Sequence, residues 1–206
     1  MVSHKNMKFL CNVGIILIAF LIFNSSQITY AANEEENIAK EAKLIVEKPI
    51  NDQSYKALTE FCNHRITNED RLFCVRVLKS SPVSATANDY VSLLKIAIDL
   101  SVGNAKKTKD YITTLSSNNA TKPPLIPVLK ECISAYDETL NQLSLIAVDL
   151  VDDPPMASYD AHQANEELRN CENSLQICKV ADESILSRHK IAKAYGRLVE
   201  EIANSI

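Results

Sequence analysis

The stretch that decides the fold is LKECISAYDETLNQLSLIAVDL, residues 129–150. Its apolar residues recur alternately every four and every three positions, which is the spacing that places side chains on one face of an α-helix. The residues concerned are Leu129, Ile133, Tyr136, Leu140, Leu143, Ala147 and Leu150. We therefore predict one long helix whose apolar face packs into the core of a helical bundle.

The same spacing continues toward the C-terminus. It is repeated by Ala161, Ala164, Leu168, Cys171, Leu175 and Cys178, and again by Ile185, Ala192, Tyr195, Val199 and Ile202. A broader apolar helix is predicted over residues 85–115, and prolines at 82, 123, 124, 127, 154 and 155 separate the helices. Alternation of the kind that marks a β-strand is not sustained anywhere. The predicted fold class is all-α, with an up-and-down four-helix bundle over residues 83–206.

Two shorter helices are predicted ahead of the bundle. Residues 52–62 and 71–80 flank a polar link, and together they make a helical hairpin within residues 54–82. Helices of that length bury too little surface to be stable alone, so the hairpin must be crosslinked or must rest on the bundle. We expect residues 54–206 to form one domain, preceded by a charged extension over residues 32–53.

The first 31 residues predict a secretory signal peptide. Lys5 and Lys8 make a basic start, and VGIILIAFLIF (residues 13–23) is an apolar run of eleven residues. Such a run is too short for a hydrocarbon core that takes about 20 residues to span, and small residues follow it. We place the cleavage after Ala31. No second apolar stretch approaches spanning length, so we expect no membrane association after cleavage.

Composition disfavours several classes of function. The chain has three glycines in 206 residues, whereas average usage gives roughly 14, and loops that cradle phosphates depend on glycine. The net charge is −4, and it becomes −6 without Lys5 and Lys8, so no basic field is available for nucleic acid. The remaining histidines, at 64, 162 and 189, lie on three different segments. We predict no catalytic residues, no metal site and no cofactor.

Two other interpretations stay open at this level. Asp149, Asp152 and Asp153 stand near a helix end and could hold a cation, although no EF-hand spacing follows and a solvated linker is favoured. The apolar stripes could line a cavity, which would make the protein a helical-bundle carrier of an apolar ligand. Stripes at this spacing form a packed core far more often than a pocket.

Five cysteines remain after the predicted cleavage: Cys62, Cys74, Cys132, Cys171 and Cys178. In an oxidising compartment they predict two disulfides and one unpaired cysteine, which allows fifteen arrangements. The hairpin can bring Cys62 close to Cys74. Cys132 and Cys171 lie on inward faces of consecutive helices. A connection over residues 152–158 would, however, place them at different heights along the two helix axes. Cys178 shares the helix face of Cys171 and is predicted to be a buried free thiol.

Four blocks of the sequence resemble the plant invertase and pectin methylesterase inhibitor family, from residue 58 to the C-terminus. The blocks are LTEFC with FCVRVLKS (58–62 and 73–80), YVSLLKIAIDL (90–100), LKECISAYDETLNQL (129–143) and LRNCE (168–172). The C-x₁₁-C and C-x₃₈-C spacings add to the resemblance. It implies a helical hairpin followed by a four-helix bundle, with the bridges Cys62–Cys74 and Cys132–Cys171.

The resemblance also implies a function. Family members are secreted, have no catalysis of their own, and bind a carbohydrate-active enzyme one to one over its substrate cleft. Pectin methylesterase inhibitors usually carry Trp and Ser-Ala-Ala-Leu before the last framework cysteine, whereas this chain lacks Trp and reads QANEEL at 163–168. Invertase inhibitors carry Pro-Lys-Phe where this chain reads DPPM at 153–156. Neither signature is matched.

The larger share of the family targets pectin methylesterase, so this enzyme is the predicted partner and acid invertase is the alternative. Pro154, Pro155 and Met156 are the candidate target contacts. The expected location is the apoplast or cell wall, with the vacuole as the alternative. Asn119 begins an Asn-Ala-Thr sequon in a predicted loop and is a candidate glycosylation site.

Overall fold

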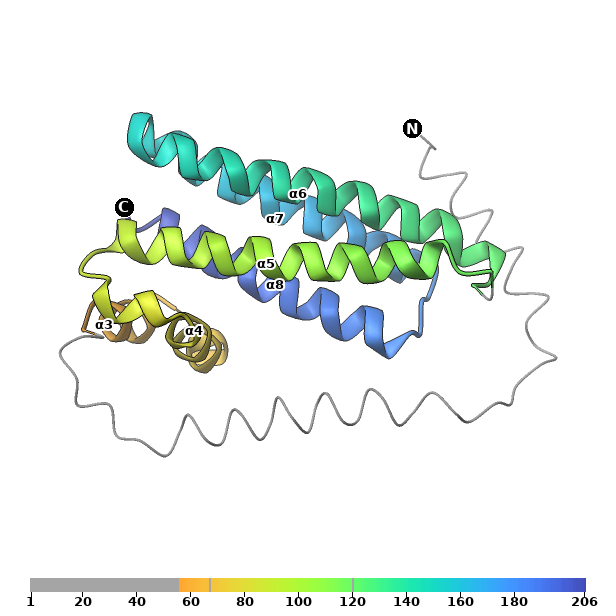
Figure 1. Ribbon diagram of the computed structural model, residues 1–206, viewed down its shortest axis with the longest axis horizontal. Helices are drawn as coiled ribbons and strands as arrows, with labels where there is room; N and C mark the ends of the chain where they lie inside the picture. Colours follow the sequence, from red (N-terminus) through yellow and green to blue (C-terminus); the bar gives the residue numbers. More distant parts are fainter. Residues whose placement is uncertain (1–55, 67, 120) are drawn as a thin grey trace.

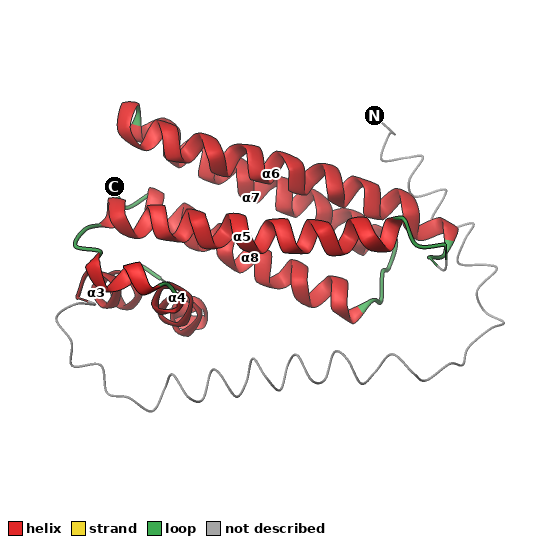
Figure 2. Ribbon diagram, viewed as in Figure 1, coloured by secondary structure: helices red, strands yellow, loops and turns green. Residues whose placement is uncertain are grey.

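The computed structural model describes residues 56–66, 68–119 and 121–206, and these ranges contain helices and connections but no β-strand (Figure 2). The α-helices are α3 (Lys56–His64), α4 (Asn68–Ser80), α5 (Tyr90–Ser116), α6 (Ile126–Asp152), α7 (Pro154–Ile177) and α8 (Glu183–Ala203). The all-α prediction is confirmed. The predicted signal peptide, residues 1–31, and the extension, residues 32–53, lie outside the described residues.

Helices α5 to α8 form the predicted up-and-down bundle (Figure 1). Each helix packs against its neighbour in sequence, and α8 returns to pack against α5. The apolar face of α6 is buried at Leu129, Tyr136 and Leu143, as the spacing predicts. Near its C-terminal end one position differs, because Ile146 is fully buried and Ala147 is exposed. The larger side chain thus occupies the core position that the sequence pattern assigned to alanine.

The hairpin of α3 and α4 rests on one end of the bundle, beside α5 and α8 (Figure 1). Cys62 and Cys74 are joined by a disulfide, with their Cα atoms 5.8 Å apart. The ring of Phe73 meets the edge of Tyr195 of α8 at a centroid distance of 5.2 Å. Arg197 of α8 also donates two hydrogen bonds to Asp70. The hairpin is therefore both crosslinked and supported by the bundle, the two means of stabilisation that its short helices require.

Two helix starts differ from the sequence prediction. Residues 82–86 form a 3₁₀ turn, η2, and α5 begins only at Tyr90, where the carboxylate of Asp89 accepts a hydrogen bond from the Ser92 amide at 2.7 Å. The predicted connection over residues 152–158 is almost entirely helical, because α6 ends at Asp152 and α7 begins at Pro154. A single residue, Asp153, joins these two long helices.

This short connection explains how the second disulfide forms. Cys132 lies 21 residues before Asp153 and Cys171 lies 18 residues after it, so antiparallel helices place the two cysteines within about one turn of each other. Their Cα atoms are 4.5 Å apart. The longer connection that the sequence predicted would not have placed them level.

The two glycines of the bundle occupy opposite environments, which gives a matched pair of substitutions. A Cβ atom at Gly196 of α8 would lie 2.2 Å from Asn165 Oδ1 and 3.0 Å from a methyl carbon of Leu168. Asn165 is buried and donates a hydrogen bond to Glu200, so it cannot move without losing that bond. We expect Gly196→Ala to lower the free energy of unfolding by about 1–3 kcal/mol, as overpacked cores do.

The control is Gly103→Ala in α5, where an added Cβ would meet nothing within 4 Å. There the substitution removes backbone freedom from the unfolded chain and improves helix propensity, so a gain of up to about 1 kcal/mol is expected. Urea unfolding of both variants measures the two changes. A stabilising Gly196→Ala would contradict the close packing of α7 on α8.

Candidate functional site

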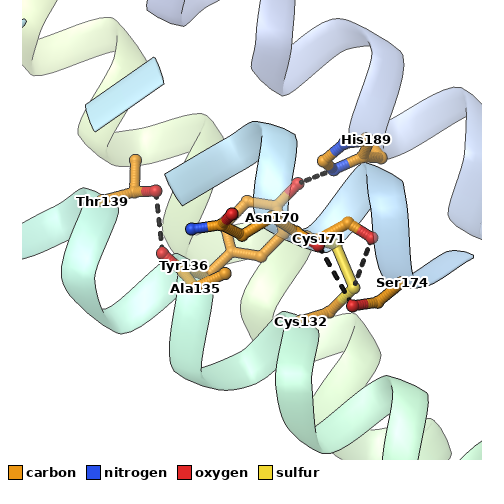
Figure 3. The surroundings of a disulfide bond; sticks show 8 residues. All are labelled: Cys132, Ala135, Tyr136, Thr139, Asn170, Cys171, Ser174 and His189. Atoms are coloured by element: carbon orange, nitrogen blue, oxygen red, sulfur yellow. Dashed lines mark hydrogen bonds between the residues drawn. A yellow bond between two sulfur atoms is a disulfide. The ribbon is translucent and has the colours of Figure 1, made fainter. Parts of the chain in front are cut away.

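Both predicted disulfides are present. Cys62–Cys74 crosslinks the two helices of the hairpin. Cys132–Cys171 crosslinks α6 and α7 within the hydrophobic core at the far end of the bundle from the hairpin. Figure 3 shows the second bridge beside the aromatic ring of Tyr136. All four of these cysteines are at most 1% exposed. They are structural crosslinks, and they hold the helices that any surface site depends on.

The prediction of a free thiol at Cys178 is wrong. Cys178 is disulfide-bonded, and no cysteine in the described part of the chain is free. Cys62, Cys74, Cys132 and Cys171 form the two bridges described above.

A buried polar pair lies next to the second disulfide (Figure 3). The hydroxyl of Tyr136 is 3.0 Å from Nδ1 of His189, and both residues are at most 3% exposed. Burial raises the pKa of Tyr136 and lowers the pKa of His189 to about 4. His189 Nε2 has no hydrogen-bond partner among the described residues. The pair is enclosed by the bundle and holds α6 to α8, so it is a structural contact rather than a catalytic one.

His189 should make stability depend on pH. In the unfolded chain the imidazole titrates near 6.5, but in the folded chain its pKa is about 4. Between these values the unfolded chain binds a proton that the folded chain does not, so the free energy of unfolding falls as the pH is lowered through this window. The expected loss from this residue is about 3 kcal/mol by pH 4.

The variant His189→Gln tests this expectation, because glutamine keeps a hydrogen-bonding group beside Tyr136 and does not titrate. Urea unfolding at a series of pH values should show a smaller loss of stability in the variant than in the native protein. Equal losses in both proteins would show that His189 is not the group responsible.

The end of the bundle where α6 turns into α7 carries a cluster of exposed apolar side chains. We call residues 145–160 the α6–α7 tip. Leu145, Val148 and Val151 lie three residues apart on α6 and are 40%, 59% and 75% exposed. Met156 and Tyr159 on α7 are 46% and 56% exposed. Five of the eight large apolar residues that are exposed in the described chain thus fall in this one short segment. A concentration of exposed apolar side chains in one segment is typical of an interaction surface.

The charged residues of the tip itself are all acidic. From residue 131 to residue 161 the sequence contains no lysine, arginine or histidine, and seven of those residues are acidic. Four of the acids, Asp149, Asp152, Asp153 and Asp160, belong to the tip. The surface therefore combines apolar side chains with negative charge, which suits a partner surface that is apolar and basic.

The candidate contact residues Pro154, Pro155 and Met156 form the first turn of α7. Proline is well suited to this position, because the first turn of a helix needs no amide donor. The carboxylate of Asp153 caps the turn by accepting a hydrogen bond from the Met156 amide at 3.3 Å. All three candidate residues are exposed. The structure places them at the end of the tip, on a rigid helix rather than on a flexible linker.

Asp160 lies beneath this surface and is only 5% exposed. Burial raises the pKa of Asp160 to about 6, and the neighbouring carboxyl group of Asp149 on α6 adds to this rise.

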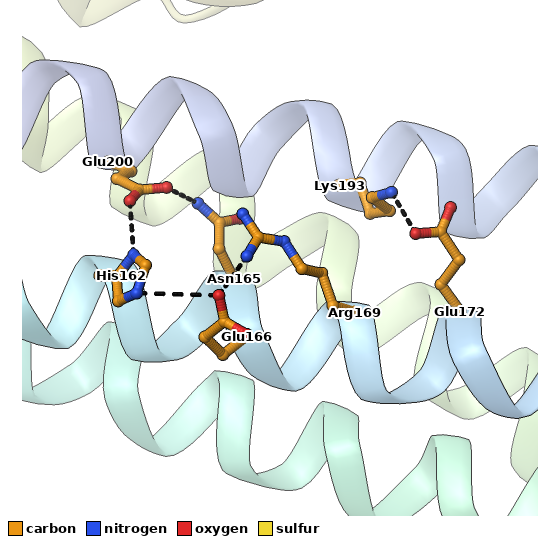
Figure 4. A network of polar contacts seen from close by, with 7 residues as sticks. All are labelled: His162, Asn165, Glu166, Arg169, Glu172, Lys193 and Glu200. Carbon is orange, nitrogen blue, oxygen red and sulfur yellow. Dashed lines mark hydrogen bonds and ion pairs between the residues drawn. The ribbon is translucent and has the colours of Figure 1, made fainter.

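Polar side chains link α7 to α8 along the neighbouring face (Figure 4). Nδ1 of His162 is 2.9 Å from Glu200, and the same carboxylate accepts a hydrogen bond from Asn165. Further along, Lys193 of α8 pairs with Glu172 of α7. These contacts are on the surface or partly buried, and they fix α8 against α7 without assembling a nucleophile and a base.

The described residues contain no assembled catalytic or metal site. His64 ends α3, His162 lies on the surface of α7, and His189 is buried in the bundle, so the structure does not bring the three together. No group of three or more His, Cys, Asp or Glu side chains in the described ranges is placed to hold a metal ion. Asp149, Asp152 and Asp153, which the sequence offered as a possible cation site, lie in these ranges and form no such group.

A cavity of about 80 Å³ lies between α4 and α8, lined by Phe73, Arg197 and Leu198 among others. Small-molecule pockets usually have volumes of roughly 300–1,000 Å³. This cavity therefore gives no support to the interpretation of the bundle as a carrier of an apolar ligand. None of the described helices combines the length and the hydrophobicity needed to span a lipid bilayer.

Asn119 is exposed and lies in the connection between α5 and α6. In an up-and-down bundle this connection is at the end opposite the α6–α7 turn, which Figure 1 shows plainly. A glycan on Asn119 would therefore project away from the tip.

The sequence prediction missed Leu145, Val148 and Val151. They are a second apolar stripe on α6, spaced every three residues outside the core-facing seam. This spacing was a usable signal, because a long helix with one buried face has no need of a second apolar face.

The described chain is a disulfide-pinned hairpin and four-helix bundle that presents an apolar, acidic tip. Residues 56–200 match the sequence profile of the plant invertase/pectin methylesterase inhibitor family, and the chain belongs to that family. Among curated proteins, no sequence matches the chain.

Solved structures share the fold. A crystal structure of a mutant form of a pectin methylesterase inhibitor from Arabidopsis superposes with a TM-score of 0.62 at 17% identity, over 72% of this chain and 96% of that chain. A second structure, a pectin methylesterase inhibitor from Arabidopsis thaliana, gives a TM-score of 0.52 at 15% identity, over 72% of this chain and 95% of that one. At these identities the similarity establishes the fold.

Proposed function

We propose that the protein is a secreted inhibitor that binds a plant pectin methylesterase and covers its active-site cleft. The observation that carries this proposal is the family match over residues 56–200, which spans the hairpin and nearly all of the bundle. The two similar Arabidopsis structures are of pectin methylesterase inhibitors, which favours this enzyme over acid invertase. The inhibitor acts by binding alone, in a one-to-one complex in the apoplast, and takes no cofactor.

The α6–α7 tip is the surface that we assign to the enzyme. Its apolar side chains are exposed at the end of two helices that the Cys132–Cys171 disulfide and the one-residue turn hold together. Burying exposed apolar area on a rigid element favours association with little loss of conformational freedom. Pro154, Pro155 and Met156 would make contact first, because they form the outermost turn.

The charge of the tip supports the same assignment. Pectin carries free carboxylates beside its neutral methyl esters, so we expect the cleft that binds it to offer positive charge. An inhibitor surface without a basic residue from 131 to 161 is complementary to such a cleft. The glycosylation sequon at Asn119 is at the opposite end of the bundle, where a glycan would leave the docking surface clear.

The deciding experiment adds the purified protein, without residues 1–31, to a plant pectin methylesterase and separately to an acid invertase. The assays cover about pH 4.5 to about pH 7, because acidic side chains titrate in that range. We expect saturable, one-to-one loss of pectin methylesterase activity and unchanged invertase activity. Inhibition of invertase alone would select the alternative target, and inhibition of neither enzyme would contradict the proposed function.

A further inference from the structure

Basic and acidic residues occupy separate segments of α5 and α6. Residues 100–130 include five lysines and one acid, whereas residues 131–161 include seven acids and no base. Lys106, Lys107 and Lys109 lie within about one turn of α5. The acidic segment ends at the tip. The basic segment is therefore a surface that the proposed docking of the tip does not use.

The lysines lie on or beside the solvent face of α5, which is bordered by α6 and α8 (Figure 1). Lys106 and Lys107 are exposed, and neither forms an ion pair with any described residue. An added Cβ at Gly103, one turn before Lys106, would meet nothing within 4 Å. Asp110, one turn after Lys106, is the acid of this segment. This part of α5 is thus open to a ligand.

Helix α6 extends the basic surface on one side. Lys109 is half-buried and pairs with Asp137 of α6, so these two charges offset each other. Lys130 lies seven residues before Asp137 and therefore on the same face of α6. It is exposed and forms no ion pair with a described residue.

Helix α8 extends it on the other side. The guanidinium carbon of Arg188 lies 4.6 Å from the centre of the Tyr111 ring, where the cation is attracted to the aromatic face. Lys107 lies one turn before Tyr111 on α5, so its side chain neighbours the same ring. We use the name α5 basic face for Lys106, Lys107, Lys109, Lys130 and Arg188.

The α5 basic face differs in kind from the tip. None of the eight large apolar side chains that are exposed in the described chain lies within residues 84–144 or on α8. Interfaces between proteins are apolar at their centre, and this face has no such centre. Flexible ammonium groups attract negative charge without demanding a fixed geometry, and arginine matches planar carboxylates. The chemistry suits a flexible chain of carboxylates.

We propose that the α5 basic face binds a polyuronate, a polysaccharide whose unesterified sugar units each carry a carboxylate. The choice of this polyanion rests on the proposed function. A pectin methylesterase converts neutral methyl esters to carboxylates, so the polymer gains negative charge where the enzyme has acted. The face attracts this product more strongly than the esterified substrate, which retains the inhibitor on the stretches that the enzyme has processed.

The polymer and the enzyme can be bound at the same time. Lys130 and Val151 are 21 residues apart on α6, which separates them by about 30 Å along the helix. A polymer on the α5 basic face therefore leaves the tip uncovered. Binding to the polymer then raises the local concentration of the inhibitor around an enzyme working on the same chain.

A binding assay without any enzyme tests the face directly. The purified protein without residues 1–31 is titrated with polygalacturonate and, separately, with highly methyl-esterified pectin, at low ionic strength and about pH 6, where uronates and lysines are charged. A chelator keeps divalent cations from crosslinking the polymer. We expect affinity for polygalacturonate to be at least about tenfold higher, and to fall by more than about tenfold in 0.3 M salt. Equal binding of both polymers, or binding of neither, would overturn the proposal.

The variant Lys106→Gln with Lys107→Gln locates the binding. Glutamine keeps the helix propensity of lysine and removes the charge, so affinity for polygalacturonate should fall about tenfold while the fold is retained. Replacing both lysines by arginine should preserve binding. Lys56→Gln with Arg76→Gln removes two exposed charges from the hairpin and should change affinity less than about twofold. An equal loss in the hairpin variant would show that the α5 basic face is not the site.

Inhibition assays separate this proposal from the proposed function. On a soluble substrate, Lys106→Gln with Lys107→Gln should inhibit pectin methylesterase within about threefold of the native protein. If polygalacturonate is bound and no enzyme is inhibited, the α5 basic face stands and the proposed function fails. If the enzyme is inhibited and polygalacturonate is not bound, the face proposal is refuted. Loss of inhibition with unchanged polymer binding would assign these lysines to an acidic protein partner and would also refute it.

Discussion

Replacing Cys132 and Cys171 together by serine is expected to lower the free energy of unfolding by about 4 kcal/mol. The bridge closes a loop between residues 39 apart in sequence, so its removal restores a large amount of conformational freedom to the unfolded chain. It also leaves two hydroxyl groups in a fully buried site, since neither cysteine is exposed. Because small domains are stable by about 5–15 kcal/mol, this one change would remove a large part of the total.

The matched control is the double replacement of Cys62 and Cys74 by serine. That bridge spans residues 12 apart, so the same reasoning gives about 3 kcal/mol. The two variants should also differ in where they loosen, because Cys62–Cys74 lies in the hairpin and Cys132–Cys171 lies in the bundle. Urea unfolding measures the overall loss, and hydrogen exchange locates it. A Cys132/Cys171 variant as stable as the native protein would show that packing alone fixes α6 against α7.

Most of the fold could be predicted from the spacing of apolar residues. The seam on residues 129–150 required a long helix, and the same spacing further along required partners of similar length. The errors lie at helix ends. The break at Pro154 and Pro155 is present, but the expected connection over residues 152–158 was too long, because proline is favoured in the first turn of a helix and α7 begins at Pro154. A single connecting residue cannot be distinguished from a longer linker by composition alone.

The candidate site could be predicted less fully, because it depends on which faces of α6 stay uncovered. Leu145, Val148 and Val151 have the same residue types as the core, and only the placement of the neighbouring helices shows that they are exposed. The influence of Asp149 on the pKa of Asp160 depends on the register across the turn at Asp153. That register was unknown as long as the length of the connection was unknown.

Introducing lysine at both Val148 and Val151 is expected to raise the inhibition constant for pectin methylesterase by about 100-fold. These side chains are 59% and 75% exposed, so the free inhibitor should keep its fold and its stability. In the complex the substitution replaces buried apolar contacts with two charges that lack partners. It also offsets part of the negative charge of a surface that we expect to meet a basic one, so the electrostatic attraction is weakened.

The chain supplies a close control for this substitution. Val83 lies in the turn η2, next to the hairpin and outside residues 145–160, and it is 60% exposed. Val83→Lys adds the same side chain at a similar exposure, so it should change inhibition less than about threefold if the tip is the docking surface. Circular dichroism and thermal unfolding confirm that both variants are folded before inhibition is measured.

The pattern of results across the variants decides which surface binds the enzyme. If the tip variant loses inhibition and Val83→Lys keeps it, the contact with the enzyme lies on residues 145–160. Comparable loss in both would indicate a charge effect spread over the whole acidic surface, which high salt would reduce. Full inhibition by the tip variant would exclude the tip while leaving the inhibitor function intact. Because Val148 and Val151 lie away from the packed core, each of these outcomes reports on binding and not on folding.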